Sequence, residues 1–117
     1  ASLDPTLFLP GSLMLFFPLV KSRHTRPLFR TPDEETFFLF DILRTIPHEA
    51  VASVLAENRR LYEQSRGLGS RFYTISAVQM EPHDWQEHFR PVWGRLVSEK
   101  RRHDPDNVLG AGTRVFN

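Results

Sequence analysis

Apolar and polar positions along the first half of the chain form patterns that predict its strands. Residues 12–17 are a short apolar run bounded by Gly11 and Pro18, which indicates a buried strand. Thr36–Leu43 is aromatic and β-branched with apolar residues on both faces, and it predicts the strongest strand of the chain. Asp41 interrupts this apolar run. A carboxylate in such a setting either pairs with an arginine or lies close to a site.

A helical stripe of apolar residues follows at 47–67, where most charged side chains fall outside the stripe. Pro47 suits the first turn of this helix, and Gly67 or Gly69 suits its end. In residues 71–78, Phe72, Thr74, Ser76 and Val78 alternate with Tyr73, Ile75 and Ala77. This period of two predicts a third strand.

Two further helices are expected towards the C-terminus, at 83–89 and 91–102. Pro91 separates them, because proline disrupts a helix interior but suits the first turn of a new helix. Asp84 with Glu87 three residues later resembles a capping box at the start of the first helix.

The predicted order of elements is strand, strand, helix, strand, helix, helix and tail, which is typical of an α+β fold. We expect an antiparallel sheet of about three strands that is covered by helices on one face. Such a sheet is thin for a free-standing domain and suggests that further protein completes it. Residues 1–11 are expected to be irregular, because prolines and a glycine interrupt them.

The loop at 21–32 is polar and basic, with Phe29 isolated among its cations. One interpretation is a solvated loop, and the other is a lip that attracts an anionic or electron-rich ligand. The four cations are Lys21, Arg23, Arg26 and Arg30.

Composition narrows the classes of function. Lys+Arg 15 against Asp+Glu 14 leaves a net charge of +1, which argues against nucleic acid and anionic membrane surfaces as partners. Cysteine is absent, so disulfides and thiolate chemistry are excluded, and the five histidines show no metal-binding spacing. No apolar run approaches the roughly 20 residues that span a bilayer, and no signal peptide is visible. We therefore expect no metal, no membrane partner and a cytoplasmic location.

No local motif forms a complete active site. The chain lacks a Gly-x-Ser-x-Gly elbow, a P-loop and a dinucleotide fingerprint. Its 10 Phe, 2 Trp and 2 Tyr indicate either an unusually aromatic core or a face that meets a missing partner. The chain begins at Ala1 without a methionine, as a fragment would. In its tail, Gly110 and Gly112 allow the main chain to approach another surface closely.

A series of residues in a recognisable order extends along most of the chain. It comprises Phe17-Pro18-Leu19, Phe37-Phe38, Ile42-Leu43, Glu57-Asn58-Arg59-Arg60, Asp84-Trp85, His88-Phe89, Trp93, Lys100, Asp104-Pro105, Leu109, Gly112 and Phe116-Asn117. No single match is specific, but the series in this order and spacing is. From about Ser12 to Asn117 the sequence resembles the C-terminal part of the cytokinin dehydrogenases, FAD-linked oxidases of the vanillyl-alcohol oxidase superfamily.

The resemblance implies the C-terminal portion of a larger two-domain flavoenzyme that binds FAD and oxidises an amine or alcohol. Residues 1–106 would form part of the substrate (cap) domain, and residues 107–117 would return to the FAD-binding domain. The catalytic residues would lie before Ala1, so the segment alone is expected to be inactive. Its partners would be the preceding FAD-binding portion of the same protein and a small-molecule substrate.

The resemblance also implies residues of the substrate pocket. Leu43 corresponds to the family's wall residue on the long strand, and the strand that ends at Pro18 borders the same pocket. Leu13 stands where the plant enzymes have proline. Together with Asp41, which is selected by its place in the apolar strand and not by the resemblance, these residues are the expected pocket wall.

The expected cofactor contacts are Gly112, Thr113 and Ile75. Gly112-Thr113 stands where the family has a Gly-Gln pair that faces the flavin, and Thr113 can make only one hydroxyl hydrogen bond there. Ile75 replaces a tyrosine that the plant enzymes place near the cofactor. These differences argue against cytokinin itself as the substrate more than they argue against the flavin chemistry.

A second hypothesis comes from another class of function. The chain could be a free-standing α+β module that binds a ligand or a partner with its aromatic face and has no catalysis. Little exposed apolar surface would favour the module, and an open apolar face would favour the flavoenzyme segment.

Overall fold

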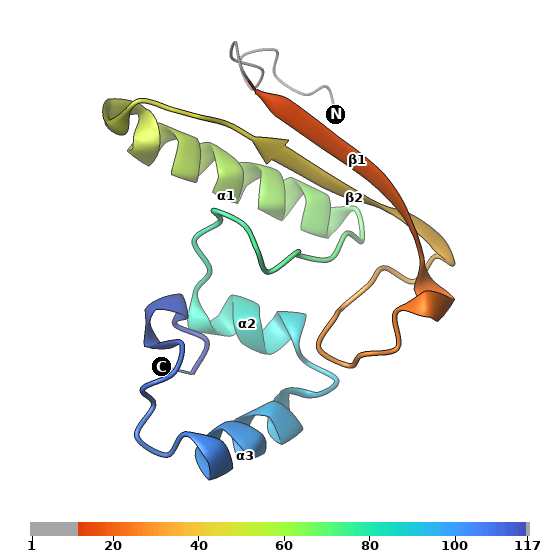
Figure 1. Ribbon diagram of the computed structural model, residues 1–117, viewed down its shortest axis with the longest axis vertical. Helices are drawn as coiled ribbons and strands as arrows, with labels where there is room; N and C mark the ends of the chain where they lie inside the picture. Colours follow the sequence, from red (N-terminus) through yellow and green to blue (C-terminus); the bar gives the residue numbers. More distant parts are fainter. Residues whose placement is uncertain (1–11, 117) are drawn as a thin grey trace.

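The structure, a computed structural model, describes residues 12–116, with the exception of the Ala111 side chain. Its strands are β1 (Leu13–Val20) and β2 (Thr36–Leu43), and its helices are α1 (Val51–Gly67), α2 (Pro82–His88) and α3 (Trp93–His103). Short 3-10 turns lie at Lys21–Arg23, His48–Ala50 and Ala111–Thr113. In Figure 1, α1 runs alongside the two-stranded sheet, and α2, α3 and the tail form a second group on the far side of α1. The α+β class is confirmed; the irregular segment expected at 1–11 lies outside the described residues.

The sheet is antiparallel, and its register determines which side chains share a face. Leu13 lies opposite Leu43, and Pro18 lies opposite Phe38. Side chains of directly opposed residues point to the same face, so Leu13, Leu43 and Asp41 share one face and Pro18 belongs to the other. β1 extends beyond the expected end at residue 17, because a proline is tolerated in a strand that has a free edge.

The third strand expected at 71–78 is wrong. This segment is irregular, with bends at residues 74–77, and the sheet of the described part has two strands. Side chains of α1 bind its backbone in place of a neighbouring strand: Asn58 Nδ2 donates to the Ala77 carbonyl at 2.9 Å, and Arg59 donates to the Gln79 carbonyl at 3.0 Å. The alternation of side chains is present, but the carbonyls are already occupied by polar groups of a helix.

The helices match expectation apart from their starts. α1 ends at Gly67, and Gly69 follows with a φ of 90°, a conformation that glycine adopts without strain. The capping box expected at Asp84 and Glu87 is wrong by one turn, because the N-cap is Glu81 and its amide donates to Asp84 Oδ2 at 2.9 Å. Pro91 lies in the turn before α3 rather than inside its first turn.

The buried core lies away from the sheet. Met80, Trp85 and Phe89 are its buried apolar residues among those described. The partly buried residues packed against them are Tyr62, Phe72, Val78, Val92, Trp93, Leu96 and Val115. The core therefore joins α1, α2, α3 and the tail, whereas both faces of the hairpin keep large apolar side chains exposed. None of the described helices combines the length and the apolar composition that crossing a bilayer requires.

Candidate functional site

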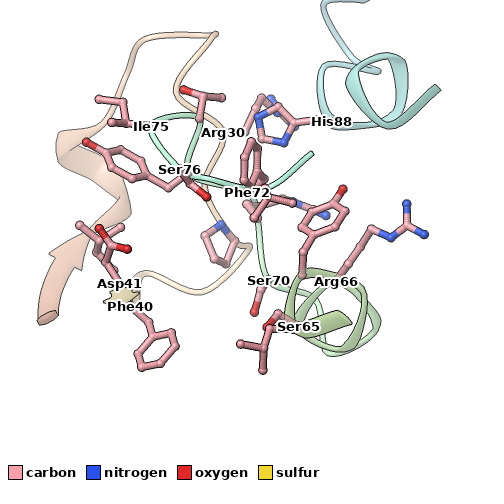
Figure 2. A pocket seen from close by; sticks show the side chains of 18 of the residues that line it. Arg30, Phe40, Asp41, Ser65, Arg66, Ser70, Phe72, Ile75, Ser76 and His88 are labelled. Atoms are coloured by element: carbon pink, nitrogen blue, oxygen red, sulfur yellow. The ribbon is translucent and has the colours of Figure 1, made fainter. Parts of the chain in front are cut away.

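A cavity of about 320 Å³ lies between β2, the loop that precedes it, α1 and the irregular segment at 70–78. Figure 2 shows its walls, with Asp41 on the β2 side and Ile75 and Ser76 on the side of the irregular segment. Asp41 and Ile75 were expected at the substrate and the cofactor respectively, and the fold brings both into the lining of one cavity.

The other expected pocket residues do not line this cavity. Leu13 and Leu43 lie opposite each other at one end of the hairpin, on the face that also holds Asp41, and they are 55% and 45% exposed. Pro18 projects from the opposite face. Leu13 and Leu43 are therefore an exposed apolar pair on the same face of the hairpin as Asp41.

Asp41 forms no ion pair with any residue between 12 and 116, although it is half-buried. Arg44, the residue that follows β2, donates from its guanidinium to Asn58 Oδ1 on α1. Asp41 was expected either to pair with an arginine or to lie close to a site. Within the described residues it does not pair with an arginine.

His88 forms the end of the cavity nearest α2. Its ring lies edge-on to Phe72, with ring centroids 6.0 Å apart, and contacts Trp85 and Phe89 of the core. Burial, reinforced by the positive charges of two nearby guanidiniums, lowers the pKa of His88 from 6.5 to about 4. The imidazole is therefore neutral at physiological pH.

The guanidiniums that act on His88 belong to Arg30, from the loop before β2, and Arg71, from the irregular segment. The loop is held against the segment by Phe29, which contacts Tyr73 edge-on at a centroid distance of 6.4 Å. The sequence named Arg30 and Phe29 only within the basic loop, as one of two interpretations, and gave no role to Arg71 or Tyr73.

The C-terminal tail is held to α2 through a hydrogen bond between a side chain of α2 and a backbone carbonyl of the tail. The indole Nε1–H of buried Trp85 donates to the Thr113 carbonyl at 3.0 Å, and the Thr113 hydroxyl donates to the Gly110 carbonyl at 2.7 Å. Gly110 has a φ of 73°, which favours glycine there. Gly112 is exposed, and a Cβ added to it would meet no atom within 4 Å. This turn presents an open backbone surface outside the cavity lining.

The chain between α3 and this turn is held by Asp104. Its carboxylate accepts hydrogen bonds from the amides of Val108 and Leu109, each at 2.9 Å, and from the Lys100 ammonium group. Lys100 also donates to the Leu109 carbonyl at 2.6 Å. The Lys100 ammonium and the two amides lower the pKa of Asp104. Among residues 12–116, no three His, Asp or Glu side chains gather as metal ligands would.

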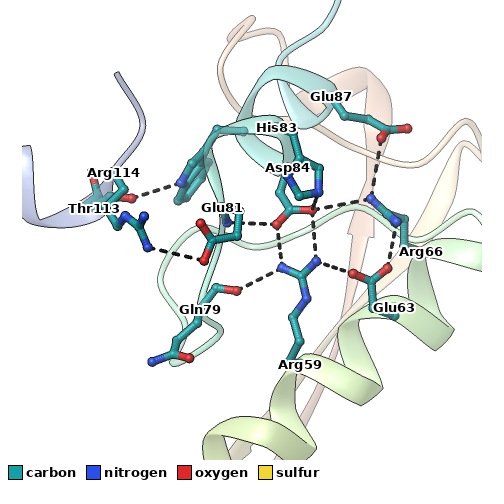
Figure 3. Close-up of polar contacts among 11 residues, drawn as sticks. Arg59, Glu63, Arg66, Gln79, Glu81, His83, Asp84, Glu87, Thr113 and Arg114 are labelled. Carbon is teal, nitrogen blue, oxygen red and sulfur yellow. Dashed lines mark hydrogen bonds and ion pairs between the residues drawn. The ribbon is translucent and has the colours of Figure 1, made fainter. Parts of the chain in front are cut away.

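α1 and α2 are joined by a charged network (Figure 3). At its centre Asp84, fully buried, accepts from Arg59 at 2.5 and 3.1 Å. Burial by itself would raise the pKa of Asp84, but hydrogen bonds from Arg59 and the Glu81 amide outweigh it and lower the pKa. Arg66, which lines the cavity, is bound to Glu63 at 2.7 Å and lies 3.6 Å from Asp84.

The family model described as "Cytokinin dehydrogenase 1, FAD and cytokinin binding" matches residues 9–116. An uncharacterized oxidoreductase, ORF5 in the fasciation locus of Rhodococcoides fascians, is 39% identical over 105 residues, which are 90% of this chain and 24% of that protein. Cytokinin dehydrogenase 9 of Oryza sativa subsp. japonica is 32% identical over 108 residues, 88% of this chain and 20% of the relative.

Cytokinin dehydrogenase 5 of Arabidopsis thaliana is 31% identical over 112 residues, which cover 88% of this chain and 20% of the relative. The chain thus spans between a fifth and a quarter of the length of these curated relatives. No solved structure matches the chain significantly.

Proposed function

We propose that this chain, which belongs to the FAD- and cytokinin-binding family of the cytokinin dehydrogenases, supplies a substrate-pocket wall and a flavin-edge contact to an FAD-dependent oxidoreductase. The longer polypeptide would oxidise an amine or alcohol, with a cytokinin-like substrate among the candidates. Residues 1–106 would belong to its substrate domain and residues 107–117 would reach its FAD-binding domain. The preceding part of the same polypeptide would supply the catalytic residues.

The observation that supports the pocket role most directly is the meeting of Asp41 and Ile75 in one cavity. They come from a strand and an irregular segment that are distant in sequence. Ile75 was expected from the family pattern, and Asp41 was expected because a carboxylate interrupts an apolar strand. The exposed apolar pair of Leu13 and Leu43 would continue this wall, and a wall of this kind suits a flat, mostly apolar ligand. An apolar sheet this open supports the flavoenzyme segment over the free-standing module.

The exposed backbone of the tail supports a contact with the edge of a flavin. Gly112 offers exposed backbone without a side chain, and Trp85 holds the following carbonyl in place. The hydroxyl proton of Thr113 is already donated to Gly110, so its oxygen remains only as an acceptor. The isoalloxazine, when bound, supplies the hydride acceptance, and the residues of this chain orient the ligand and exclude water.

The test uses the complete polypeptide that contains this chain. We expect the purified protein to be yellow, and an N6-alkylated adenine or a benzylic alcohol to bleach its visible flavin absorbance under anaerobic conditions. Leu43→Arg should raise KM about tenfold or more, since it places a charge in an apolar wall. Leu68→Arg, at an exposed position of the α1 C-cap, is the matched control and should leave KM unchanged.

Gly112→Val tests the tail separately. Because a side chain at residue 112 meets nothing in this chain, the substitution should not disturb the chain itself. A shifted flavin spectrum or lost flavin then reports contact with the cofactor. A colourless polypeptide, or equal effects of Leu43→Arg and Leu68→Arg, would contradict the proposed function.

A further inference from the structure

The cavity contains positive charge that the described chain does not neutralise. Arg30, Arg66 and Arg71 all line it, and Arg66 is paired with Glu63 at 2.7 Å. Neither Arg30 nor Arg71 has an ion-pair partner between residues 12 and 116. Asp41 is on the opposite wall, on β2. One end of the cavity is therefore cationic and the other holds a single carboxylate.

Two buried polar atoms of the cavity residues also lack a hydrogen-bond partner among residues 12–116. They are Nε of Arg30 and Nε2 of His88. A buried donor without an acceptor destabilises the folded state, so native proteins rarely leave one unmatched. Since His88 is neutral at physiological pH, the positive charge at this end comes from the guanidiniums. Both atoms lie on residues at the same end of the cavity, where an acceptor group would satisfy them.

The remaining wall of this end is aromatic. Phe72 lies edge-on to His88, and Tyr73 lies edge-on to Phe29 of the basic loop. The volume of about 320 Å³ is at the lower limit of small-molecule sites, which suits a single ring system rather than a dinucleotide. Aromatic side chains favour a flat ligand, and a guanidinium matches the geometry of a carboxylate or a phosphate.

We propose that this cavity binds a flat aromatic ligand through a carboxylate or phosphate group, which Arg30 and Arg71 recognise while Phe72 and Tyr73 contact the ring. The inference rests on the proposed function, because it assigns a substrate class to the same pocket. It makes the substrate an aromatic acid or phosphate ester that bears the oxidisable amine or alcohol. The basic loop is then a recognition element rather than a solvated loop.

The test measures binding to the complete polypeptide by isothermal titration calorimetry, with benzoate, phenyl phosphate and the neutral isostere benzamide as probes. Benzoate or phenyl phosphate should bind about tenfold tighter than benzamide, since hydrogen bonds to charged groups are the stronger ones. Arg30→Gln and Arg71→Gln should each remove this preference, and Arg30→Lys should retain part of it. Arg26→Gln is the matched control, because Arg26 is exposed on the same loop and does not line the cavity.

The two anionic probes distinguish the source of the anion: tighter benzoate indicates a carboxylate substrate, and tighter phenyl phosphate a phosphate ester. Equal binding of benzoate, phenyl phosphate and benzamide, absence of binding, or an Arg26→Gln effect as large as that of Arg30→Gln would overturn the inference. Thermal unfolding of each variant identifies one that fails to fold. In that case the test is whether Arg30→Lys retains part of the preference for the anionic probes. The assay needs no flavin chemistry, so anion binding without substrate oxidation would contradict only the proposed function. Oxidation of neutral substrates without anion binding would contradict only the inference.

Discussion

Asp84 and Arg59 form a bidentate ion pair that joins α2 to α1, with the carboxylate fully buried and the guanidinium partly exposed. The same carboxylate accepts the Glu81 amide and so also fixes the start of α2. One side chain therefore determines where α2 begins and how it lies against α1, and the position of His88 in the cavity depends on both.

Asp84→Asn should destabilise the fold by about 2–3 kcal/mol, because Arg59 would lose its buried anionic partner and keep only the more exposed Glu63. Urea unfolding checks the value. Arg90→Gln is the control, since its contact with Glu87 is 3.9 Å long and exposed, and it should cost less than about 0.5 kcal/mol. Similar losses in both variants would show that the network is not a buried anchor.

The same carboxylate makes stability sensitive to acid. The pKa of Asp84 is lower in the folded chain than in the unfolded chain, so its contribution is present above the unfolded value of about 4 and is lost as the pH falls through the folded value. Wild-type protein should therefore lose stability below about pH 4 more steeply than Asp84→Asn does. Unfolding midpoints measured across this range give the comparison, and parallel curves would contradict the assignment.

His88 should affect stability at a higher pH than Asp84 does, because folding favours its neutral imidazole over the protonated form. Its pKa falls from 6.5 to about 4 on folding, so between these values the unfolded chain binds a proton that the folded chain does not. Stability should therefore decrease as the pH is lowered from 6.5 to 4. His88→Gln should flatten this limb of the curve, whereas His48→Gln, at an exposed turn, should not.

Trp85→Phe should loosen the tail while it keeps the ring in the core. The variant loses the hydrogen bond to the Thr113 carbonyl, a cost of about 1 kcal/mol, and some core packing, because a phenyl ring is smaller than an indole. Amide hydrogen exchange should become faster for residues 108–116 and remain unchanged in α1. Trp93→Phe is the control, because Trp93 packs on Phe116 by ring stacking. Equal exchange in both variants would mean that stacking, rather than the indole N–H, holds the tail.

Phe16 and Phe38 form an exposed aromatic pair on the hairpin, with ring centroids 4.3 Å apart and planes within 8°. They are 62% and 51% exposed, so the 117-residue chain expressed alone should bind a hydrophobic dye strongly. The double variant Phe16→Ser, Phe38→Ser should reduce dye fluorescence and aggregation without loss of helical signal. Unchanged dye binding would place the accessible apolar surface elsewhere.

Strand and helix positions followed from the sequence where one periodicity dominated. The apolar run of Thr36–Leu43 predicted β2 with its bounds, and Gly67 marked the end of α1. The irregular segment at 71–78 was misread, because alternation records which side chains share a face and not which group binds the backbone. Only the fold shows that Asn58 binds the carbonyl of Ala77 in this segment and that Arg59 binds that of Gln79 just after it.

The site was predictable in part. The apolar strand pattern selected Asp41, the family pattern selected Ile75, and the structure places both in one cavity. Arg71 and His88 were not selected as site residues, because the irregular segment and α2 bring them to the cavity only when both pack against α1, which no short-range pattern encodes. The role of the expected Gly112 and Thr113 at a flavin remains a prediction.

The location of the core has a consequence for how this chain can change over time. Met80, Trp85 and Phe89 keep the helices and tail together, whereas the hairpin and the basic loop contribute little to that packing. Substitutions on the hairpin and loop are therefore nearly neutral for folding of the chain itself. Related proteins can diverge in which molecules they accept while they retain one scaffold, and natural variation should concentrate on the loop at 21–32 rather than around Trp85.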